Sequence, residues 1–261
     1  MWYTPNVFFD SILIVAYVLA FIIVLVSTRR KAYYGKFSTG GIALNPKLGW
    51  FCMEFPGFCT FIFCYFQGLY WREPIQLVFL GIWMFHYGYM SMVFPSWIRN
   101  PKGAKANFGV PVLCGGITIT VLNGYLNATF ITNYAEHLTT QWWSDPRLYL
   151  GLGIYGVGIT INIHADYIQT RLRTKEEVER GEKVYRIPHG GLYEYVTNPS
   201  YFGQSLAWLG FTIASWSLTG LFIFLLTIGN LVFRAKDIHQ WYLNKFPEYP
   251  KHRKIMIPFL Y

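Results

Sequence analysis

Seven apolar runs recur along the 261-residue chain, and their lengths restrict what it can fold into. They cover residues 11–27, 50–70, 75–94, 108–131, 148–164, 201–216 and 218–233. A helix needs about 20 residues, within a range of about 17–25, to cross the hydrocarbon core of a bilayer. Five runs meet that length. The last two are short and almost continuous, so we expect a tight helical hairpin that extends into flanking residues.

The composition favours a chain that lies largely in lipid. Only 13% of the residues are charged, whereas soluble domains carry about 25%. This excludes a disordered chain, a coiled coil and an ordinary soluble enzyme. The four cysteines form no C-x-x-C pair and lie in apolar runs, so we expect neither disulfides nor a metal site. No segment resembles a DNA-reading module, and nucleic acid is not an expected partner.

The cations between the runs predict the orientation in the membrane. Cytoplasmic loops of membrane proteins carry an excess of Lys and Arg. When the loops are assigned alternately to two sides, 20 of the 22 Lys and Arg residues fall on one side, and only Arg72 and Arg147 fall on the other. We therefore predict an all-α, multi-pass integral membrane protein with seven transmembrane helices, its N-terminus outside and its C-terminus in the cytoplasm. A bacterial inner membrane and the endoplasmic reticulum fit this pattern equally.

Two polar residues lie at membrane depth in neighbouring spans. Glu54 is four residues into the second span, about 6 Å at the rise of an α-helix. Tyr87 is seven residues before the end of the third span, about 10 Å by the same rise. A carboxylate at this depth needs a partner or a cavity, so we predict a functional role for Glu54. Because the two spans run in opposite directions, Glu54 and Tyr87 can meet in the cytoplasmic half of the membrane.

Further polar groups gather at the cytoplasmic ends of the later spans. Residues 162–167 combine Asn, His and Asp, which suits a polar pocket better than a helix end anchored by Lys or Arg. Residues 171–203 mix arginines, glycines and aromatics around a charged helix expected at 175–183. Arginine binds phosphates bidentately and stacks on flat rings. This cluster suits a nucleotide that arrives from the cytoplasm and, equally, a surface resting on anionic lipid headgroups.

Residues 151–156 match the pattern G-x-G-x-x-G, but they lie inside an apolar span. The dinucleotide fingerprint requires a preceding strand and a tight turn before its helix. We therefore interpret Gly151, Gly153, Gly156 and Gly158 as sites of close helix packing.

These residues, in this order, resemble the steroid 5α-reductase family across nearly the whole chain. The matching stretches are 49–56, 86–87, 123–126, 162–167, 185–188, 190–192, 234–236, 241–243, 249–251, 253–254 and 257–259. The C-terminal stretches are the most specific of these.

The resemblance implies an NADPH-dependent reductase of the 4,5 double bond of 3-oxo-4-ene steroids, whose substrate enters from the bilayer. It implies one membrane domain over residues 1–261, with the substrate side in 1–131 and the cofactor side in 132–261. Glu54 and Tyr87 would be catalytic and hold the 3-keto oxygen, and Trp50 would line the steroid pocket. The implied NADPH-binding residues are Asn123, Asn162, Asp166, Arg173, Tyr185, Arg186, Ser200, Arg234, His239 and Tyr242.

Several positions depart from the family pattern. They are Ser200 in place of Asn, Gln204 and Ala207 in place of Glu, Ile238 in place of His, and Tyr89 in place of Arg. We expect these differences to affect substrate choice and fine cofactor contacts rather than the fold.

Other functions stay open at this stage. Membrane reductases of enoyl thioesters or polyprenols would share the fold. An isoprenylcysteine-type methyltransferase would also hold a cofactor at a cytoplasmic C-terminal cluster, but it would bind S-adenosylmethionine and have no use for Glu54 and Tyr87. A receptor or transporter is disfavoured, because the polar residues face the cytoplasm and no inverted repeat is found. Lipids are the expected surroundings, and no obligate protein partner is indicated.

Overall fold

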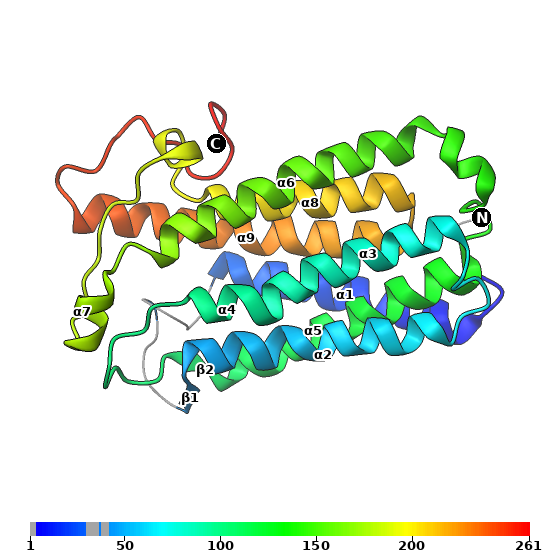
Figure 1. Ribbon diagram of the computed structural model, residues 1–261, viewed down its shortest axis with the longest axis horizontal. Coiled ribbons are helices and arrows are strands. Elements are labelled where there is room, and N and C mark those ends of the chain that lie inside the picture. The colour runs from blue at the N-terminus through cyan, green and yellow to red at the C-terminus, as the bar shows by residue number, and fades with distance from the viewer. Residues whose placement is uncertain (1–3, 30–36, 38–41) are drawn as a thin grey trace.

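Long helices dominate the structure, a computed structural model that describes residues 4–29, 37 and 42–261 (Figure 1). Three cations used to predict the orientation, Arg30, Lys31 and Lys36, lie outside these residues. The long helices are α1 (Val7–Arg29), α2 (Pro46–Phe66), α3 (Pro74–Gly88), α5 (Val110–Thr129), α6 (Pro146–Thr170), α8 (Pro199–Ser215) and α9 (Leu218–Lys245).

Shorter elements extend or connect these helices. Helix α3 continues through a π-helical turn, η2 (Tyr89–Val93), into α4 (Phe94–Trp97), and α5 continues into a second π-helical turn, η3 (Phe130–Tyr134). The remaining elements are α7 (Lys175–Glu179), the 3₁₀ turns η4 (Thr140–Ser144) and η5 (Gly191–Glu194), and the antiparallel strands β1 (Ala43–Leu44) and β2 (Phe108–Gly109). Ala43 pairs with Gly109 and Leu44 with Phe108.

Six helical segments of the described chain are long and apolar enough to cross a membrane. They are α1, α2, α3 through α4, α5 through η3, α6 and α9. Their outer faces carry large apolar side chains such as Phe21, Phe63 and Leu150, each more than half exposed. Apolar surface of this extent needs a partner, and for spans of this length lipid is that partner. The predicted multi-pass membrane fold is therefore confirmed. Helix α8 has 17 residues, and the count of seven spans and their orientation stay predictions.

Several helix ends differ from the predicted spans. Helix α2 begins at Pro46 rather than at residue 50, because Asn45 caps it by accepting a hydrogen bond from Lys47 N (2.9 Å), and proline suits the first turn. It ends at Phe66, before residue 70. Helix α9 continues to Lys245, well past the predicted end at 233. Helix α7 stops before the predicted end at 183, because Gly181 adopts a φ of 76°.

The expected hairpin between the last two runs is present. Helix α8 ends at Ser215, and Trp216 takes a left-handed φ of 43°. Ser217 then caps α9 by accepting a hydrogen bond from Gly220 N (3.0 Å). The two-residue connection holds α8 and α9 side by side.

Helices α6 and α8 lie side by side along the bundle (Figure 1). A Cβ atom on Gly158 of α6 would lie 2.4 Å from the backbone nitrogen of Ala207, and one on Gly203 of α8 would lie 2.5 Å from that of Asn162. Gly151 likewise packs on α8, so close packing is confirmed for Gly151 and Gly158. It is wrong for Gly153 and Gly156, where an added Cβ would meet nothing within 4 Å.

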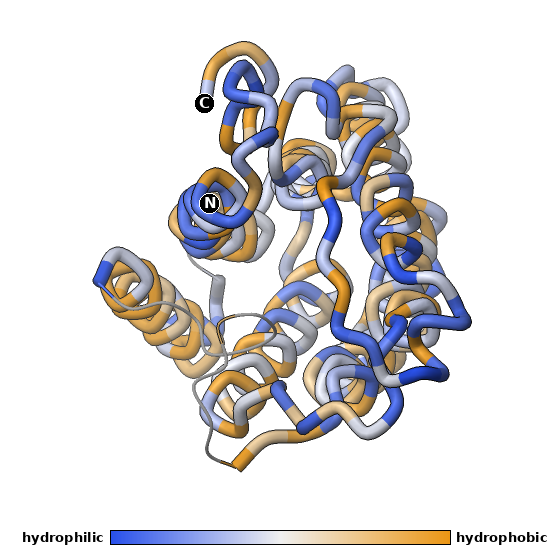
Figure 2. Tube along the Cα trace, turned by 90° about the vertical axis from the view of Figure 1, so that its left-hand side faces the viewer, coloured by the Kyte–Doolittle hydropathy of each residue, from blue (hydrophilic) through white to orange (hydrophobic). Residues whose placement is uncertain are grey.

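The described parts of the loops predicted to be cytoplasmic gather at one end of the bundle. Helix α7, both strands and the C-terminal segment lie at the left of Figure 1. Figure 2 looks onto this end and shows hydrophilic loops in front of largely hydrophobic helices. Arg253, which is 2% exposed, donates a hydrogen bond to Pro188 O (2.9 Å), and Lys254 forms a β-bridge with Val196. The C-terminal segment is thereby fastened to the loop that precedes α8.

Candidate active site

A cavity of about 1190 Å³ lies at this end of the bundle. Sites for one small molecule usually measure about 300–1,000 Å³, so this cavity is larger than a single ligand requires. Its walls combine apolar side chains from α2, α5 and α9 with cations from residues 99–105 and 173–186. Eleven of the predicted site residues line it: Trp50, Glu54, Tyr87, Asn162, Asp166, Arg173, Tyr185, Arg186, Ser200, Arg234 and Tyr242.

Glu54 and Tyr87 reach the cavity from neighbouring helices. Because α2 begins at Pro46 and the α3–α4 segment ends at Trp97, Glu54 lies about 12 Å and Tyr87 about 15 Å along their helices from this end. Both are therefore deeper than the predicted spans indicated, but at similar depth. Their side chains are buried, and both line the cavity. Among the described residues, no side-chain hydrogen bond to the Glu54 carboxyl group is found.

A stack of aromatic rings holds Tyr87 in place. The ring of Trp83 stacks on Phe61 of α2 with centroids 4.1 Å apart, and Tyr87 stacks on Trp83 at 4.6 Å. These contacts restrict the ring while leaving the hydroxyl group at its tip for polar contacts. Packing thus fixes where the hydroxyl lies.

The hydroxyl of Tyr87 is bonded to an amide of α5. Nδ2 of Asn123 donates to Tyr87 Oη (2.9 Å), and Oδ1 of Asn123 accepts from Nδ2 of Asn127 (2.7 Å). Asn127 Nδ2 also faces the backbone oxygens of Asn123 (3.1 Å) and Thr219 (3.4 Å). Both asparagines are fully buried. Asn123, predicted to bind the cofactor, instead stands behind Tyr87 and does not appear in the cavity wall.

Asp166 of α6 is held through both of its carboxylate oxygens. Ser200 Oγ donates to Oδ1 (2.7 Å), and Tyr89 Oη donates to Oδ2 (3.0 Å). Asn162 Nδ2 donates in turn to Ser200 Oγ (2.8 Å). The close packing at Gly203 brings these groups together. Two of the departures from the family pattern, Ser200 and Tyr89, therefore meet on one carboxylate.

The cationic part of the cavity is built from fixed arginines. Arg173 donates from Nε to Val184 O (2.8 Å) and from Nη1 to Arg99 O (3.0 Å), and Arg99 donates back to Arg173 O. The Arg173 guanidinium lies 5.4 Å from the centroid of the Tyr185 ring. Arg234 donates from Nε to Tyr201 Oη (2.8 Å). Backbone and ring contacts thus hold both charges beside the cavity.

Arg186 is paired with Glu177 of α7. The Arg186 guanidinium, together with the backbone N–H of Thr174, lowers the pKa of Glu177 from 4.5 to about 2. Glu177 and Thr174 form a capping box at the start of α7. The short helix and the arginine therefore position each other.

His239 lies behind the cavity wall. Its Nδ1 is bonded to Thr197 Oγ1, which is also bonded to the hydroxyl of Tyr249 (2.7 Å). Thr197 and its neighbour Asn198 line the cavity. Asn198 donates to the backbone oxygens of Ala235 (3.1 Å) and Ile255 (3.0 Å). The predicted histidine thus contacts the wall from outside.

Some residues of the wall were missed by sequence reasoning. The cations Lys102, Lys105 and Lys183 line the cavity, although the sequence identified them only as part of the charge asymmetry. Thr197 and Asn198 were also missed. One feature of the sequence could have identified the lysines: they lie in loops that mix cations with glycine and proline. A loop whose cations only set the orientation in the membrane does not require that mixture.

Comparison with known proteins decides the family. A family model described as 3-oxo-5-alpha-steroid 4-dehydrogenase matches residues 106–261. The steroid 5-alpha-reductase DET2 of Solanum lycopersicum is 34% identical over 232 residues, 87% of each protein. The 3-oxo-5-alpha-steroid 4-dehydrogenase 1 of Homo sapiens is 38% identical over 192 residues, 73% of this chain and 70% of that protein. This chain belongs to the 3-oxo-5-alpha-steroid 4-dehydrogenase family.

Membership of the 3-oxo-5-alpha-steroid 4-dehydrogenase family makes the chain an oxidoreductase that acts on CH–CH bonds. The family generally implies a nicotinamide cofactor. The resemblance predicted from the sequence is thus confirmed. The family assignment favours a reductase over the methyltransferase, receptor and transporter alternatives.

Proposed function

We propose that this protein uses NADPH to reduce the 4,5 double bond of 3-oxo-4-ene steroids to 5α-dihydrosteroids. The observation that carries the proposal is one cavity lined both by Glu54 and Tyr87 and by a group of cations. The names of the relatives support the reaction class: they are steroid 5-alpha-reductases and 3-oxo-5-alpha-steroid 4-dehydrogenases.

The chemistry of the lining fits a phosphorylated nicotinamide nucleotide. Arg173 and Arg234 bring guanidinium groups that suit phosphates to the wall, and Arg186 adds a cation whose fork is bound to Glu177. Tyr185 and Tyr242 offer ring faces. Asn162 Oδ1 is buried without a hydrogen-bond partner among the described residues, and the N–H of a nicotinamide carboxamide is a suitable donor for it. When bound, NADPH supplies the hydride that C5 of the steroid accepts.

Tyr87 is the proposed donor to the 3-keto oxygen. Reduction at C5 pushes negative charge onto that oxygen, and a fixed donor aimed at it lowers the barrier. Because Tyr87 Oη accepts from Asn123, its own hydrogen is free to point toward the substrate. Glu54 would orient Tyr87 through its charge, or donate a second hydrogen bond when protonated. The C4 carbon of the resulting enolate is then protonated.

Asn127 determines which end of the Asn123 amide group faces Tyr87. Three oxygens surround its amide nitrogen, so the nitrogen is fixed on that side. Oδ1 of Asn123 is then held as the acceptor, and Nδ2 of Asn123 must face Tyr87. We therefore assign Asn127 as a positioning residue that acts through Asn123.

The steroid enters from the bilayer in this proposal. Ile23 and Val26 of α1, Phe94 of α4 and Phe108 of β2 line the cavity, and the rings of Phe94 and Phe108 contact Trp50. Apolar walls suit a sterol better than a charged substrate. The proposal keeps seven spans, with the loops of Figure 2 in the cytoplasm, where NADPH is found.

The test is NADPH oxidation by the detergent-purified protein, followed at the nicotinamide absorbance with and without testosterone or progesterone. We expect steroid-dependent oxidation and a 5α-dihydro product. NADPH binding without steroid turnover would overturn the substrate assignment and point to enoyl thioesters or polyprenols. Absence of NADPH binding would overturn the cofactor assignment.

A further inference from the structure

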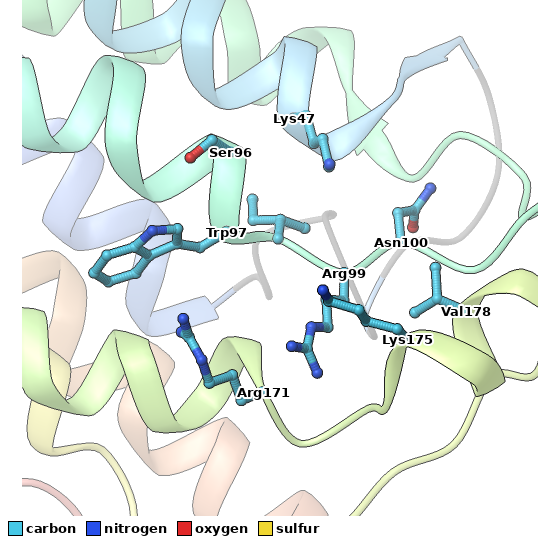
Figure 3. Close-up of a pocket in the computed structure, with 9 residues that line it drawn as sticks. Lys47, Ser96, Trp97, Arg99, Asn100, Arg171, Lys175 and Val178 are labelled. Atoms are coloured by element: carbon cyan, nitrogen blue, oxygen red, sulfur yellow. The ribbon is translucent and has the colours of Figure 1, made fainter.

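A second, smaller hollow of about 310 Å³ lies beside the large cavity. Figure 3 shows its lining, in which four side chains are cationic: Lys47, Arg99, Arg171 and Lys175. The other lining residues are neutral, so its wall, as far as the structure describes it, contains no carboxylate. Arg99 and Asn100 line both hollows, which places the smaller one at the same end of the bundle.

The four cations come from three parts of the chain, since Arg171 and Lys175 are only four residues apart. Lys47 lies in the first turn of α2, Arg99 follows α4, Arg171 follows α6 and Lys175 begins α7. Like charges gathered around one hollow repel one another. A charge asymmetry that only sets orientation needs cations on one side of the membrane, but it does not need them to converge on one pocket. Convergence without a carboxylate in the described wall is the feature that needs an explanation.

Two of the cations are held by the surrounding structure. Arg99 is fixed by its exchange of hydrogen bonds with Arg173. The Arg171 guanidinium lies 3.5 Å from the centroid of the Tyr167 ring and 5.5 Å from that of Trp97. Trp97 and Tyr167 meet edge to face at 5.8 Å. The arginines are thus pre-positioned, so they lose less conformational entropy when an anion binds.

The two lysines complete the pocket from opposite sides. Lys47 projects from α2 and Lys175 from α7 (Figure 3). Both are exposed, and neither forms a salt bridge with any residue that the structure describes. Their charges are available to an added anion.

We propose that this pocket binds a phosphate group. Its position at the helix ends, beside Trp97 and Tyr167, corresponds to the headgroup level of a membrane, where aromatic residues gather. Basic pockets between helix ends on the cytoplasmic side suit the headgroups of anionic lipids. A lipid headgroup and a free phosphate share this chemistry, and the experiment separates the two sources.

The experiment compares the wild type with Lys175→Gln, with the pair Lys47→Gln and Lys175→Gln, and with a control pair, Lys245→Gln and Lys251→Gln. The control lysines are exposed and lie outside both hollows. In one arm, the purified full-length chain is titrated with phosphatidic acid in phosphatidylcholine nanodiscs, and bound lipid is counted by native mass spectrometry. In the other arm, inorganic phosphate is titrated by calorimetry in nanodiscs of phosphatidylcholine alone.

We expect the affinity for phosphatidic acid to fall about fivefold for each pocket lysine removed, and to stay unchanged in the control pair. A loss confined to the inorganic phosphate arm supports the pocket but assigns it to a free phosphate. Equal binding of both probes by the pocket pair and the wild type would overturn the proposal.

NADPH binding separates this pocket from the proposed cofactor site. Lys47 and Lys175 do not line the large cavity, so the pocket pair should bind NADPH as the wild type does. An equal loss of NADPH and phosphatidic acid binding would instead assign these lysines to the cofactor site and overturn the proposal. The single variant Lys175→Gln changes one exposed residue, which keeps the test valid if the pair fails to fold.

Discussion

The side-chain nitrogen of Asn123 donates a 2.9 Å hydrogen bond to the hydroxyl oxygen of Tyr87. Because that oxygen is already an acceptor, the hydrogen of the Tyr87 hydroxyl must point elsewhere. Tyr87 lines the cavity. A residue expected to contact the cofactor therefore determines how a proposed catalytic group presents its proton.

Replacing Asn127 should test this arrangement. Asn127→Leu removes the donor that fixes Asn123, so the Asn123 amide can turn its oxygen toward Tyr87. We expect turnover to fall about tenfold, in line with the loss of one buried hydrogen bond, with NADPH affinity unchanged. Asn127→Gln keeps an amide and should recover part of the rate. The control is Asn133→Leu, since Asn133 bonds to Leu69 N away from the cavity. A similar loss of turnover in Asn133→Leu would show that Asn127 contributes only through packing.

The hydroxyl of Tyr87 should carry more of the rate than its ring. Tyr87→Phe keeps the stack on Trp83 but loses the donor, and we expect kcat to fall about 10²–10³-fold. Glu54→Gln should also lose most turnover. Both variants should bind NADPH normally in a fluorescence titration. Unchanged turnover in Glu54→Gln would remove Glu54 from the mechanism.

Arg173 should contribute to NADPH affinity. Arg173→Ala removes a forked cation from the cavity wall, and we expect the Kd for NADPH to rise about tenfold or more. Arg180→Ala is a matched control, because Arg180 pairs with Glu182 on the surface of the same loop. An unaltered Kd in Arg173→Ala would move the phosphate site elsewhere.

The pair of Glu177 and Arg186 predicts a dependence of stability on pH. Folding lowers the pKa of Glu177 from 4.5 to about 2, so the ionised carboxylate stabilises the fold above about pH 4.5. That contribution is lost as the pH falls toward about 2. Glu177→Gln should therefore lower the unfolding temperature at neutral pH, and the difference from the wild type should shrink in acid. Glu179→Gln, on the exposed side of α7, is the control. A difference that stays constant with pH would refute the assignment.

Sequence reasoning succeeded where one physical property dominates. Hydrophobic length identified six segments that can span a membrane. The cost of a carboxylate in lipid singled out Glu54, and the structure places it in the cavity wall with Tyr87, while its role stays a prediction. It could not tell how each helix is rotated. Asn123 and His239 do not line the cavity, and their side chains bond to Tyr87 and Thr197, which do. Helix ends also shifted, because caps such as Asn45 and polar turns beyond residue 233 continue a helix past its apolar run.

The packing of α6 on α8 gives the last prediction. A Cβ atom on Gly203 would lie 2.5 Å from the backbone nitrogen of Asn162, so Gly203→Ala must push the helices apart. Overpacking of this kind typically costs about 1–3 kcal/mol. The separation would also part Asn162 from Ser200, whose hydrogen bond measures 2.8 Å. We expect Gly203→Ala to lower both the unfolding temperature in detergent and the affinity for NADPH.

Gly153 provides the matched control for this change. It lies on the same helix pair, but an added Cβ would meet nothing within 4 Å. Alanine also favours a helix over glycine by about 1 kcal/mol. Gly153→Ala should therefore leave NADPH binding unchanged and unfold at the wild-type temperature or slightly above it. If both alanine variants behaved alike in thermal unfolding and in NADPH titration, the contact at Gly203 would not be what holds Asn162 against Ser200.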